Sequence, residues 1–316
     1  DSNNLTFVNS EAVRKFSPES LSIMEFQTPT DYELTEKIYG NWPLMGEDDP
    51  ERVDQWSIKL ARELDTVADH DVLNTSGLGF PLYEGKMIHQ FDPFYTTARY
   101  HVESGRGVLR FQDKRKTSPT DYRQARMSVR AIARNTDIRT LISTMIPSGT
   151  FIGHSLYTAV GSVDYAIQLY VVSLFNSFVL DYVLRQKITN NVTLYHLNQL
   201  PLPPLNRGNP YFDKIVAAAA RLTCIHITFA ELWRDVMGEQ WVRSKGTTEP
   251  MAREYLRNDI DALVAHLYGL SRSDFDHILG TFPIVFPDHI DGRVKREELL
   301  DIYDEWGEKI ADWAKE

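Results

Sequence analysis

The sequence predicts an α+β protein, with a sheet-containing middle region and a helical C-terminal region. Between residues 81 and 160, short apolar or alternating runs are divided by Gly, Pro and Ser, as is typical of strands. From residue 211 onward, apolar residues recur at helical spacing over long stretches. With 316 residues, the chain is long enough for one large domain or two moderate ones.

Each predicted element follows from its local pattern. The first 80 residues mix helical spacing with turn-rich breaks, so we expect a connecting layer there. An apolar stretch at 163–187 predicts one long buried helix, ended by the polar KITNNVT and the proline-rich LNQLPLPPLNRGNP. Ser271 and Asp274 are spaced as a helix N-cap and its N3 acid. Strands are predicted at 86–91, 107–112, 126–133, 139–147 and 150–160.

Composition excludes several classes of protein. The apolar stretch 165–184 contains Gln168, Asn176 and Asp181, so we expect a buried helix and no membrane partner. Cys224 is the single cysteine, which excludes an internal disulfide or a cysteine-based zinc site and favours a cytoplasmic protein. The nine histidines show no ligand spacing, so no metal is expected. Because the first residues resemble neither a signal peptide nor a natural start, we expect a piece of a longer protein.

Positive charge is concentrated in one segment of an acidic chain. The net charge is -10, yet residues 99–139 hold eleven Lys or Arg against four acids and carry +7, which leaves −17 elsewhere. Such a block directs a polyanion to one surface, although a solvated, loop-rich face is the alternative. Four aromatic residues interleave with it and could form sheet core or contact sugars and bases: Tyr95, Tyr100, Phe111 and Tyr122.

Arginines recur at regular spacing in ARMSVRAIARNT. Arg126 and Arg130 alternate with the apolar Met127 and Val129, the period-two pattern of a strand buried on one side. A helix would also align the arginines, including Arg134, through their spacing of four. Either structure gives a row of guanidinium groups, which suits forked contacts with guanine and with phosphate oxygens.

Two fragments match parts of catalytic motifs. Residues 92–95 spell DPFY, one residue away from the D/N-P-P-Y/F motif that grips the flipped base in adenine-N6 methyltransferases, but no glycine-rich cofactor turn precedes it. Glu84 and Lys86 fit the E-x-K half of a metal-dependent nuclease, without a clear Pro-Asp partner upstream. We therefore predict no catalytic residue, and a degenerate methyltransferase or nuclease stays an alternative.

Four long segments carry a resemblance to a known family. They are PLYEGKMIHQFD, RMSVRAIARNTDIRTLISTMIP, LFNSFVLDYVLRQKITNNVTLYHLNQLPLP and NDIDALVAHLYGLSRSDFDHILGTFP. In this order they resemble the C-terminal part of large adenine-N6 DNA methyltransferases, namely type IIG/IIL restriction-modification enzymes and their phage-defence relatives of the BREX and DISARM kinds. The resemblance runs from about residue 31 to residue 286.

The resemblance implies a domain order. Residues 1–80 would connect to an upstream methyltransferase domain of the same polypeptide, residues 81–206 would form the target-recognition domain, and residues 207–316 a helical C-terminal domain. The family's cofactor turn and N-P-P-Y motif belong upstream of this sequence. The resemblance therefore implies no cofactor in this chain, with S-adenosylmethionine bound by the upstream domain.

The resemblance also implies a partner and a function. The partner is double-stranded DNA, and the function is sequence-specific recognition for methylation or restriction. We expect contacts to bases or phosphates from Arg126, Arg130, Arg134 and Arg139, a phosphate clamp from Lys114, Arg115 and Lys116, and a contact at the protein–DNA edge from Lys86. The alternative is a protein-interaction or regulatory module of a phage-defence system.

Overall fold

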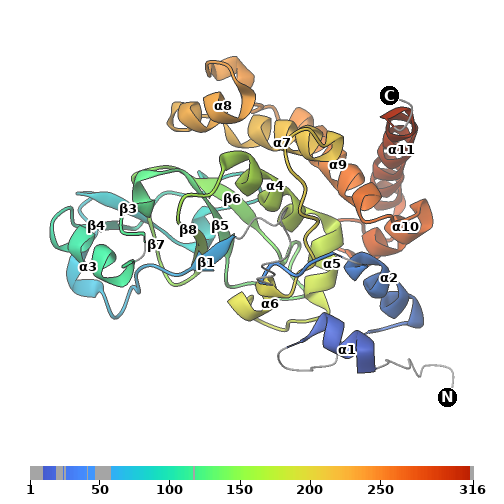
Figure 1. The fold of residues 1–316 in the computed structure, drawn as a ribbon, viewed down its shortest axis with the longest axis horizontal. Coiled ribbons are helices and arrows are strands. Elements are labelled where there is room, and N and C mark those ends of the chain that lie inside the picture. The colour runs from blue at the N-terminus through green and yellow to red at the C-terminus, as the bar shows by residue number, and fades with distance from the viewer. Residues whose placement is uncertain are drawn as a thin grey trace.

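The computed structural model describes residues 10–18, 24, 26–40, 42–46, 58–116 and 118–313. Two small β-sheets lie towards one side of the molecule and most of the helices towards the other (Figure 1). The predicted α+β class is confirmed, including its helical C-terminal region.

The first sheet, which we call the central sheet, is antiparallel throughout. Met127 and Val129 of its strand β5 (Arg126–Arg130) enter the main core beneath helix α4 (Tyr165–Asn176). The other face is buried as well, because Arg126 and Ser128 are also inaccessible, so the prediction that this strand is buried on one side is wrong. The strand order is β1 (Lys59–Ala61), β8 (Leu156–Val160), β5 (Arg126–Arg130), β6 (Ser143–Ile146).

The second sheet, the distal sheet, has its own small core. Phe111, Tyr122 and Phe151 pack at centroid distances of 4.9–5.3 Å beneath it. β3 and β7 pair in parallel, whereas the other pairs are antiparallel. The strand order is β2 (Leu73–Asn74), β4 (Tyr100–Val102), β3 (Phe80–Tyr83), β7 (Phe151–Ile152).

The strand predicted at 107–112 is wrong, because this segment belongs to helix α3 (Arg106–Lys114). Val108 and Phe111, three residues apart, face the distal core, and Leu109 between them is exposed. That spacing is helical, but the run is too short for sequence periodicity to separate it from a strand.

The long helix predicted at 163–187 is broken into α4 (Tyr165–Asn176) and α5 (Phe178–Arg185), which meet at 60°. Ser177 has extended geometry, and its hydroxyl accepts the N–H of Leu180 at 3.3 Å, so it caps the second helix. Among the described residues, no single helix has the length and apolarity to cross a membrane; this bent pair meets that criterion only jointly.

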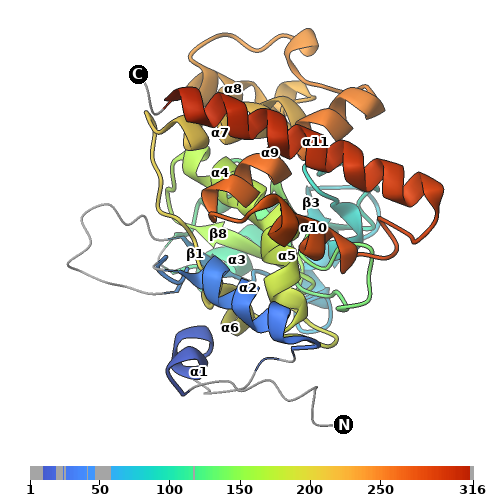
Figure 2. The same ribbon diagram turned by 90° about the vertical axis from the view of Figure 1, so that its right-hand side faces the viewer.

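The C-terminal helices extend outward from the central sheet. α4 packs on α7, α7 on α9, and α9 on α11, which runs across α9 and α10 in Figure 2. The predicted cap of α10 is confirmed, since the Ser271 hydroxyl accepts the N–H of Asp274 at 3.2 Å and the Asp274 carboxylate accepts the N–H of Ser271 at 2.8 Å. The bounds are α7 (Pro210–Thr223), α8 (Ala230–Met237), α9 (Pro250–Leu267), α10 (Arg272–Gly280) and α11 (Ile290–Trp313).

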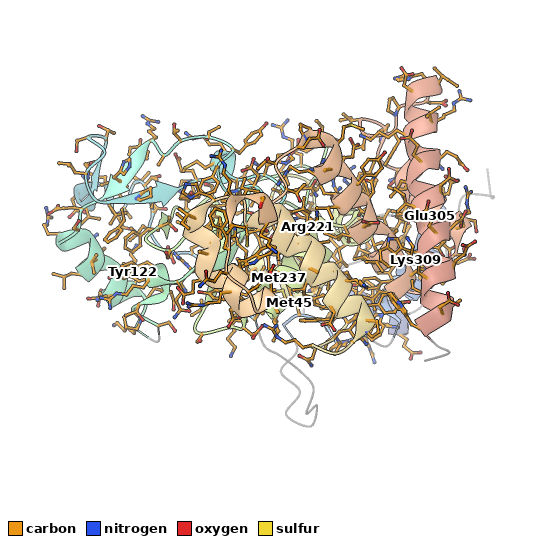
Figure 3. All side chains as sticks on the ribbon, turned by 90° about the horizontal axis from the view of Figure 1, so that it is seen from above. Met45, Tyr122, Arg221, Met237, Glu305 and Lys309 are labelled. Atoms are coloured by element: carbon orange, nitrogen blue, oxygen red, sulfur yellow. The ribbon has the colours of Figure 1, made fainter. Side chains whose placement is uncertain are left out.

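One hydrophobic core joins the central sheet to the helices, from Ala12 near the N-terminus to Tyr303 in α11. In Figure 3, side chains fill the space between the distal sheet, marked by Tyr122, and α11, marked by Glu305 and Lys309 at the opposite end. The remaining helices are α1 (Ser10–Phe16), α2 (Pro29–Tyr39) and α6 (Leu194–Asn198), with short 3-10 turns η2 (His70–Val72), η3 (Gly85–Met87), η4 (Asp121–Arg123), η5 (Ile227–Phe229) and η6 (Arg243–Lys245).

Candidate nucleic-acid interface

The segment PLYEGKMIHQFD leads out of strand β3 into a compact loop, residues 84–95, which we call the 84–95 loop. The N–H of Met87 donates to the carbonyl of Glu84 at 2.8 Å and forms the short helix η3. The strand predicted at 86–91 is wrong, because the segment forms η3 and a tight turn between His89 and Asp92, and Phe91 makes a single backbone hydrogen bond to β6.

The second half of the loop contains a strained residue. His89 and Asp92 exchange backbone hydrogen bonds of 2.8 and 3.0 Å, and Phe91 between them has φ 56°, a left-handed conformation uncommon outside glycine. The N–H of Phe91 donates to the Ser143 carbonyl at 3.2 Å, and Arg253 Nη2 donates to the Phe91 carbonyl at 3.3 Å. Contacts from β6 and α9 thus hold a conformation that costs about 1–3 kcal/mol.

Arg130 supports the loop from beneath. Its Nε donates to the carbonyl of Gly85 at 2.9 Å and its Nη2 to the carbonyl of Ile88 at 2.5 Å. These two bonds join the end of β5 to both sides of η3, and the planar guanidinium fixes their relative geometry. Arg130, one of the predicted DNA contacts, therefore positions the loop.

The loop carries one lysine and two aromatic rings that are partly exposed. The Lys86 side chain is 57% exposed beside Glu84, at 3.2 Å, and Phe94 and Tyr95 are 42% and 58% exposed. A cavity of about 380 Å³ opens next to Lys86, lined also by Arg130 and His154. The loop thus presents a cation and two aromatic rings on a backbone that Arg130 holds through two hydrogen bonds.

Two predicted contacts are buried in an ion-pair cluster. Arg126 Nη2 donates to Glu63 Oε1 at 2.9 Å and to the carbonyl of Thr150 at 2.9 Å, and Arg115 reaches the same carboxylate at 3.4 Å. Glu63 also accepts the N–H of Ile152 at 2.7 Å. These arginines connect the two sheets, so the prediction that Arg126 and Arg115 face DNA is contradicted by their burial.

Arg139 is also internal. Its Nε donates to Asp181 at 2.7 Å and its Nη2 to the carbonyl of Asn176 at 2.5 Å, while its guanidinium lies 4.0 Å from the centre of the Phe178 ring. With 7% of its surface exposed, it fixes the junction of α4 and α5 and does not face solvent as predicted.

The remaining predicted contacts do not share one surface. Lys114 pairs with Asp69 at 2.5 Å, and the Lys116 side chain is 80% exposed. Both belong to the α3 end of the molecule, far from α5 in Figure 1. Arg134 is exposed, but it lies beyond the end of β5, so the predicted row of Arg126, Arg130 and Arg134 does not form.

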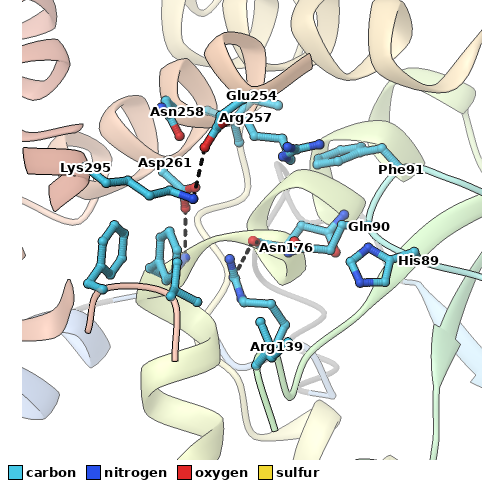
Figure 4. A pocket seen from close by; sticks show the side chains of 15 residues that line it. His89, Gln90, Phe91, Arg139, Asn176, Glu254, Arg257, Asn258, Asp261 and Lys295 are labelled. Carbon is cyan, nitrogen blue, oxygen red and sulfur yellow. Dashed lines mark hydrogen bonds and ion pairs between the residues drawn. The ribbon is translucent and has the colours of Figure 1, made fainter. Parts of the chain in front are cut away.

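A second cavity, of about 250 Å³, lies between the 84–95 loop, the α4–α5 junction and α9; we call it the α9 cavity. Gln90, Arg139, Arg257 and Asp261 surround it, and Lys295 pairs with Glu254 at its rim at 3.0 Å (Figure 4). Its walls therefore combine all four segments that carry the sequence resemblance.

Burial perturbs the ionisable groups of the α9 cavity. It raises the pKa of Asp261 to about 6, although Arg139 and a 2.8 Å hydrogen bond from the Phe178 N–H act in the opposite direction. Burial, followed by repulsion from nearby arginines, lowers the pKa of His89. Burial also lowers the pKa of Arg257, against the attraction of Glu254 and Asp261.

The catalytic fragments have structural uses. The Asp92 carboxylate accepts the N–H of Phe94 at 2.8 Å, which shapes the DPFY turn. Glu84 pairs with Lys86 within the loop. In the part of the chain that the structure describes, no group of three or more His, Cys, Asp or Glu side chains is placed to hold a metal.

The sequence did not point to Arg253, Arg257 and Asp261, because they lie in a helical region about 160 residues after the loop. One signal was present in the sequence. Asp261 lies within the apolar run IDALVAHL, and a charged residue in such a run is buried together with the apolar face of its helix.

No family model and no curated protein matches this chain. Among solved structures, a Type IIL restriction-modification enzyme, MmeI, in complex with DNA is a distant structural neighbour, with a TM-score of 0.43 and 8% sequence identity. The match covers 77% of this chain and 37% of that enzyme's chain, so this chain spans about a third of its length.

Proposed function

We propose that this chain is the DNA-recognition region of a cytoplasmic adenine-N6 DNA methyltransferase of the restriction-modification type, and that it is not itself catalytic. An upstream methyltransferase domain of the same polypeptide would bind S-adenosylmethionine and transfer the methyl group. This chain would hold the duplex so that the target adenine can be presented to that domain.

The proposal rests on one observation, which is that Arg130 holds the backbone of the 84–95 loop in place. Binding to DNA needs cations for phosphate oxygens and rings or polar groups for sugars and bases. Lys86 and Tyr95 supply both from a backbone that two guanidinium hydrogen bonds hold in place. A loop ordered before binding loses little conformational freedom on association, which favours affinity.

The proposed contacts differ from the row of arginines. Lys86, Tyr95 and the exposed Arg134 would face DNA, whereas Arg130 positions the loop. Arg126 would act through the packing of the two sheets. Some arginines of the basic segment would therefore support the fold, whereas others would contact DNA.

The test is binding of a fluorescent duplex to the Lys86→Glu and Lys116→Glu variants, measured by anisotropy at low salt. Both variants change the net charge equally, but Lys116 lies at the α3 end. Lys86→Glu should weaken binding by about tenfold, since a charged contact contributes on the order of 1–2 kcal/mol, and Lys116→Glu should bind nearly as the wild type does. Equal weakening by both changes would contradict the proposed interface, and unchanged binding in both variants would favour the protein-interaction alternative.

Incubation of the chain with DNA and labelled S-adenosylmethionine, or with DNA and Mg²⁺, tests the non-catalytic part of the proposal. The expected result is no turnover. Methyl transfer or cleavage that disappears in the Asp92→Ala or Glu84→Gln variant would assign the reaction to DPFY or to E-x-K, and would overturn this part.

A further inference from the structure

We infer that the α9 cavity is a binding site for a nucleoside phosphate, with the phosphate on Arg257 and the base towards Gln90 and Asp261. The choice of a nucleotide rests on the proposed function; the requirement for an anion and for a donor-bearing ring rests on the cavity itself.

The first element of the site is the guanidinium of Arg257. Among the described residues, no carboxylate oxygen lies within 4.0 Å of the Arg257 nitrogens, and nearby Glu254 is paired with Lys295. Arg257 is nevertheless half-buried at the cavity wall. A partly desolvated guanidinium favours an anionic oxygen strongly, and its fork matches two oxygens of one phosphate.

The second element is a pair of hydrogen-bond acceptors. Gln90 donates one N–H of its Nε2 to the Asn176 carbonyl at 2.9 Å, which fixes the amide and leaves its side-chain oxygen as an acceptor for a ligand. Asp261 accepts the Phe178 N–H through Oδ1 alone, which leaves Oδ2 as a further acceptor. Acceptors of this kind recognise N–H donors, such as the exocyclic amine of adenine or cytosine.

The third element is the size and lining of the cavity. About 250 Å³ corresponds to roughly eight water molecules at their liquid volume, which is room for a ring system with an attached acidic group. Phe178 and Phe286 contribute apolar wall next to these polar groups. A site with apolar walls and a few converging polar groups is typical of small-molecule binding.

The charges around the cavity select against other ligands. Arg139 is neutralised by Asp181, Lys295 by Glu254, and Asp261 faces Arg257 across the cavity at longer range. A cation would gain little next to Arg257, and a neutral ligand would leave this guanidinium without an anionic partner. An anionic ligand that also carries N–H donors would contact both the guanidinium of Arg257 and the acceptors of Gln90 and Asp261.

The experiment is calorimetric titration of the chain with dAMP, deoxyadenosine and inorganic phosphate. The wild type should bind dAMP at least tenfold more tightly than either fragment. Arg257→Gln should abolish this preference while deoxyadenosine binding persists, and the control Arg221→Gln, on the exposed face of α7, should leave it intact. Equal affinity for dAMP and deoxyadenosine, or a preference unaffected by Arg257→Gln, would overturn the inference.

A second arm identifies the source of the nucleotide. A duplex with one unpaired adenine is compared with a fully paired duplex of the same length. A preference for the unpaired site that Arg257→Gln removes would indicate a nucleotide turned out of DNA, whereas dAMP binding without that preference would indicate a free nucleotide. The effect of Lys86→Glu on the paired duplex is measured separately, so failure of the cavity site and failure of the loop interface remain distinguishable.

Discussion

Arg126 and Glu63 form a buried ion pair at 2.9 Å between the central sheet and the segment that follows β1. Both side chains are almost fully inaccessible, and Glu63 additionally holds the backbone of Ile152 in the distal sheet. This pair joins the two sheets on which the 84–95 loop is mounted.

The first prediction concerns this pair. Arg126→Met leaves a buried carboxylate with the weaker partner Arg115, so the free energy of unfolding should fall by about 3–5 kcal/mol in urea denaturation. The double variant Arg126→Met with Glu63→Gln should recover only part of the loss, because it removes the uncompensated carboxylate but leaves the buried guanidinium of Arg115 without this partner. Lys309→Ala, which removes the exposed pair with Glu305 at 3.6 Å, is the control and should cost less than about 1 kcal/mol. A loss below 1 kcal/mol in Arg126→Met would show that the pair is not structural.

The second prediction concerns Arg130. Lysine keeps the charge but cannot donate to the carbonyls of Gly85 and Ile88 in a fixed fork. In Arg130→Lys, amide hydrogen exchange should rise across the 84–95 loop and DNA affinity should fall, while β6 stays protected. Hydrogen–deuterium exchange mass spectrometry measures both segments together. Unchanged exchange in the loop would mean that Arg130 does not position it.

The third prediction concerns pH. Burial raises the folded-state pKa of Asp261 to about 6 from 3.8, so between these values the folded chain binds more protons than the unfolded chain. Stability contributed by this group is therefore present at low pH and lost as pH rises towards 6. This rise in the pKa of Asp261 corresponds to roughly 3 kcal/mol. The Asp261→Asn variant has no carboxyl group to titrate at this position. Its free energy of unfolding, relative to that of the wild type, should therefore be higher at pH 7 than at pH 4, by up to that amount.

The measurement is thermal unfolding of both proteins across pH 4–7. Asp288→Asn, at a fully accessible carboxylate, is the control and should show no such pH dependence. If the difference between Asp261→Asn and the wild type is the same at every pH, the carboxyl group does not titrate as its burial indicates.

The sequence predicted β5 and the cap at Ser271 because both depend on neighbours a few residues away. It did not predict the burial of Arg126, whose partner Glu63 lies 63 residues earlier along the chain. Period and composition report which side chains share a face, but whether that face meets water or another layer depends on the fold. The break at Ser177 shows the same limit, since an apolar run long enough for one helix is divided by a serine cap.

The candidate site shows the same limit. Lys86 was expected at an edge facing DNA, and it lies on an exposed loop. Arg130 from β5 supports this loop, and the loop shares a cavity with Arg257 and Asp261 from α9. Both relationships depend on contacts across the whole fold. Local patterns contain no information on such convergence.

The most direct test of the loop interface is the salt dependence of duplex binding for the wild type, Lys86→Gln and Lys116→Gln. Each phosphate contact contributes about one unit to the slope of log affinity against log salt concentration. The slope should decrease by about one in Lys86→Gln and stay unchanged in Lys116→Gln. Identical slopes in all three proteins would contradict the claim that the 84–95 loop contacts the DNA backbone.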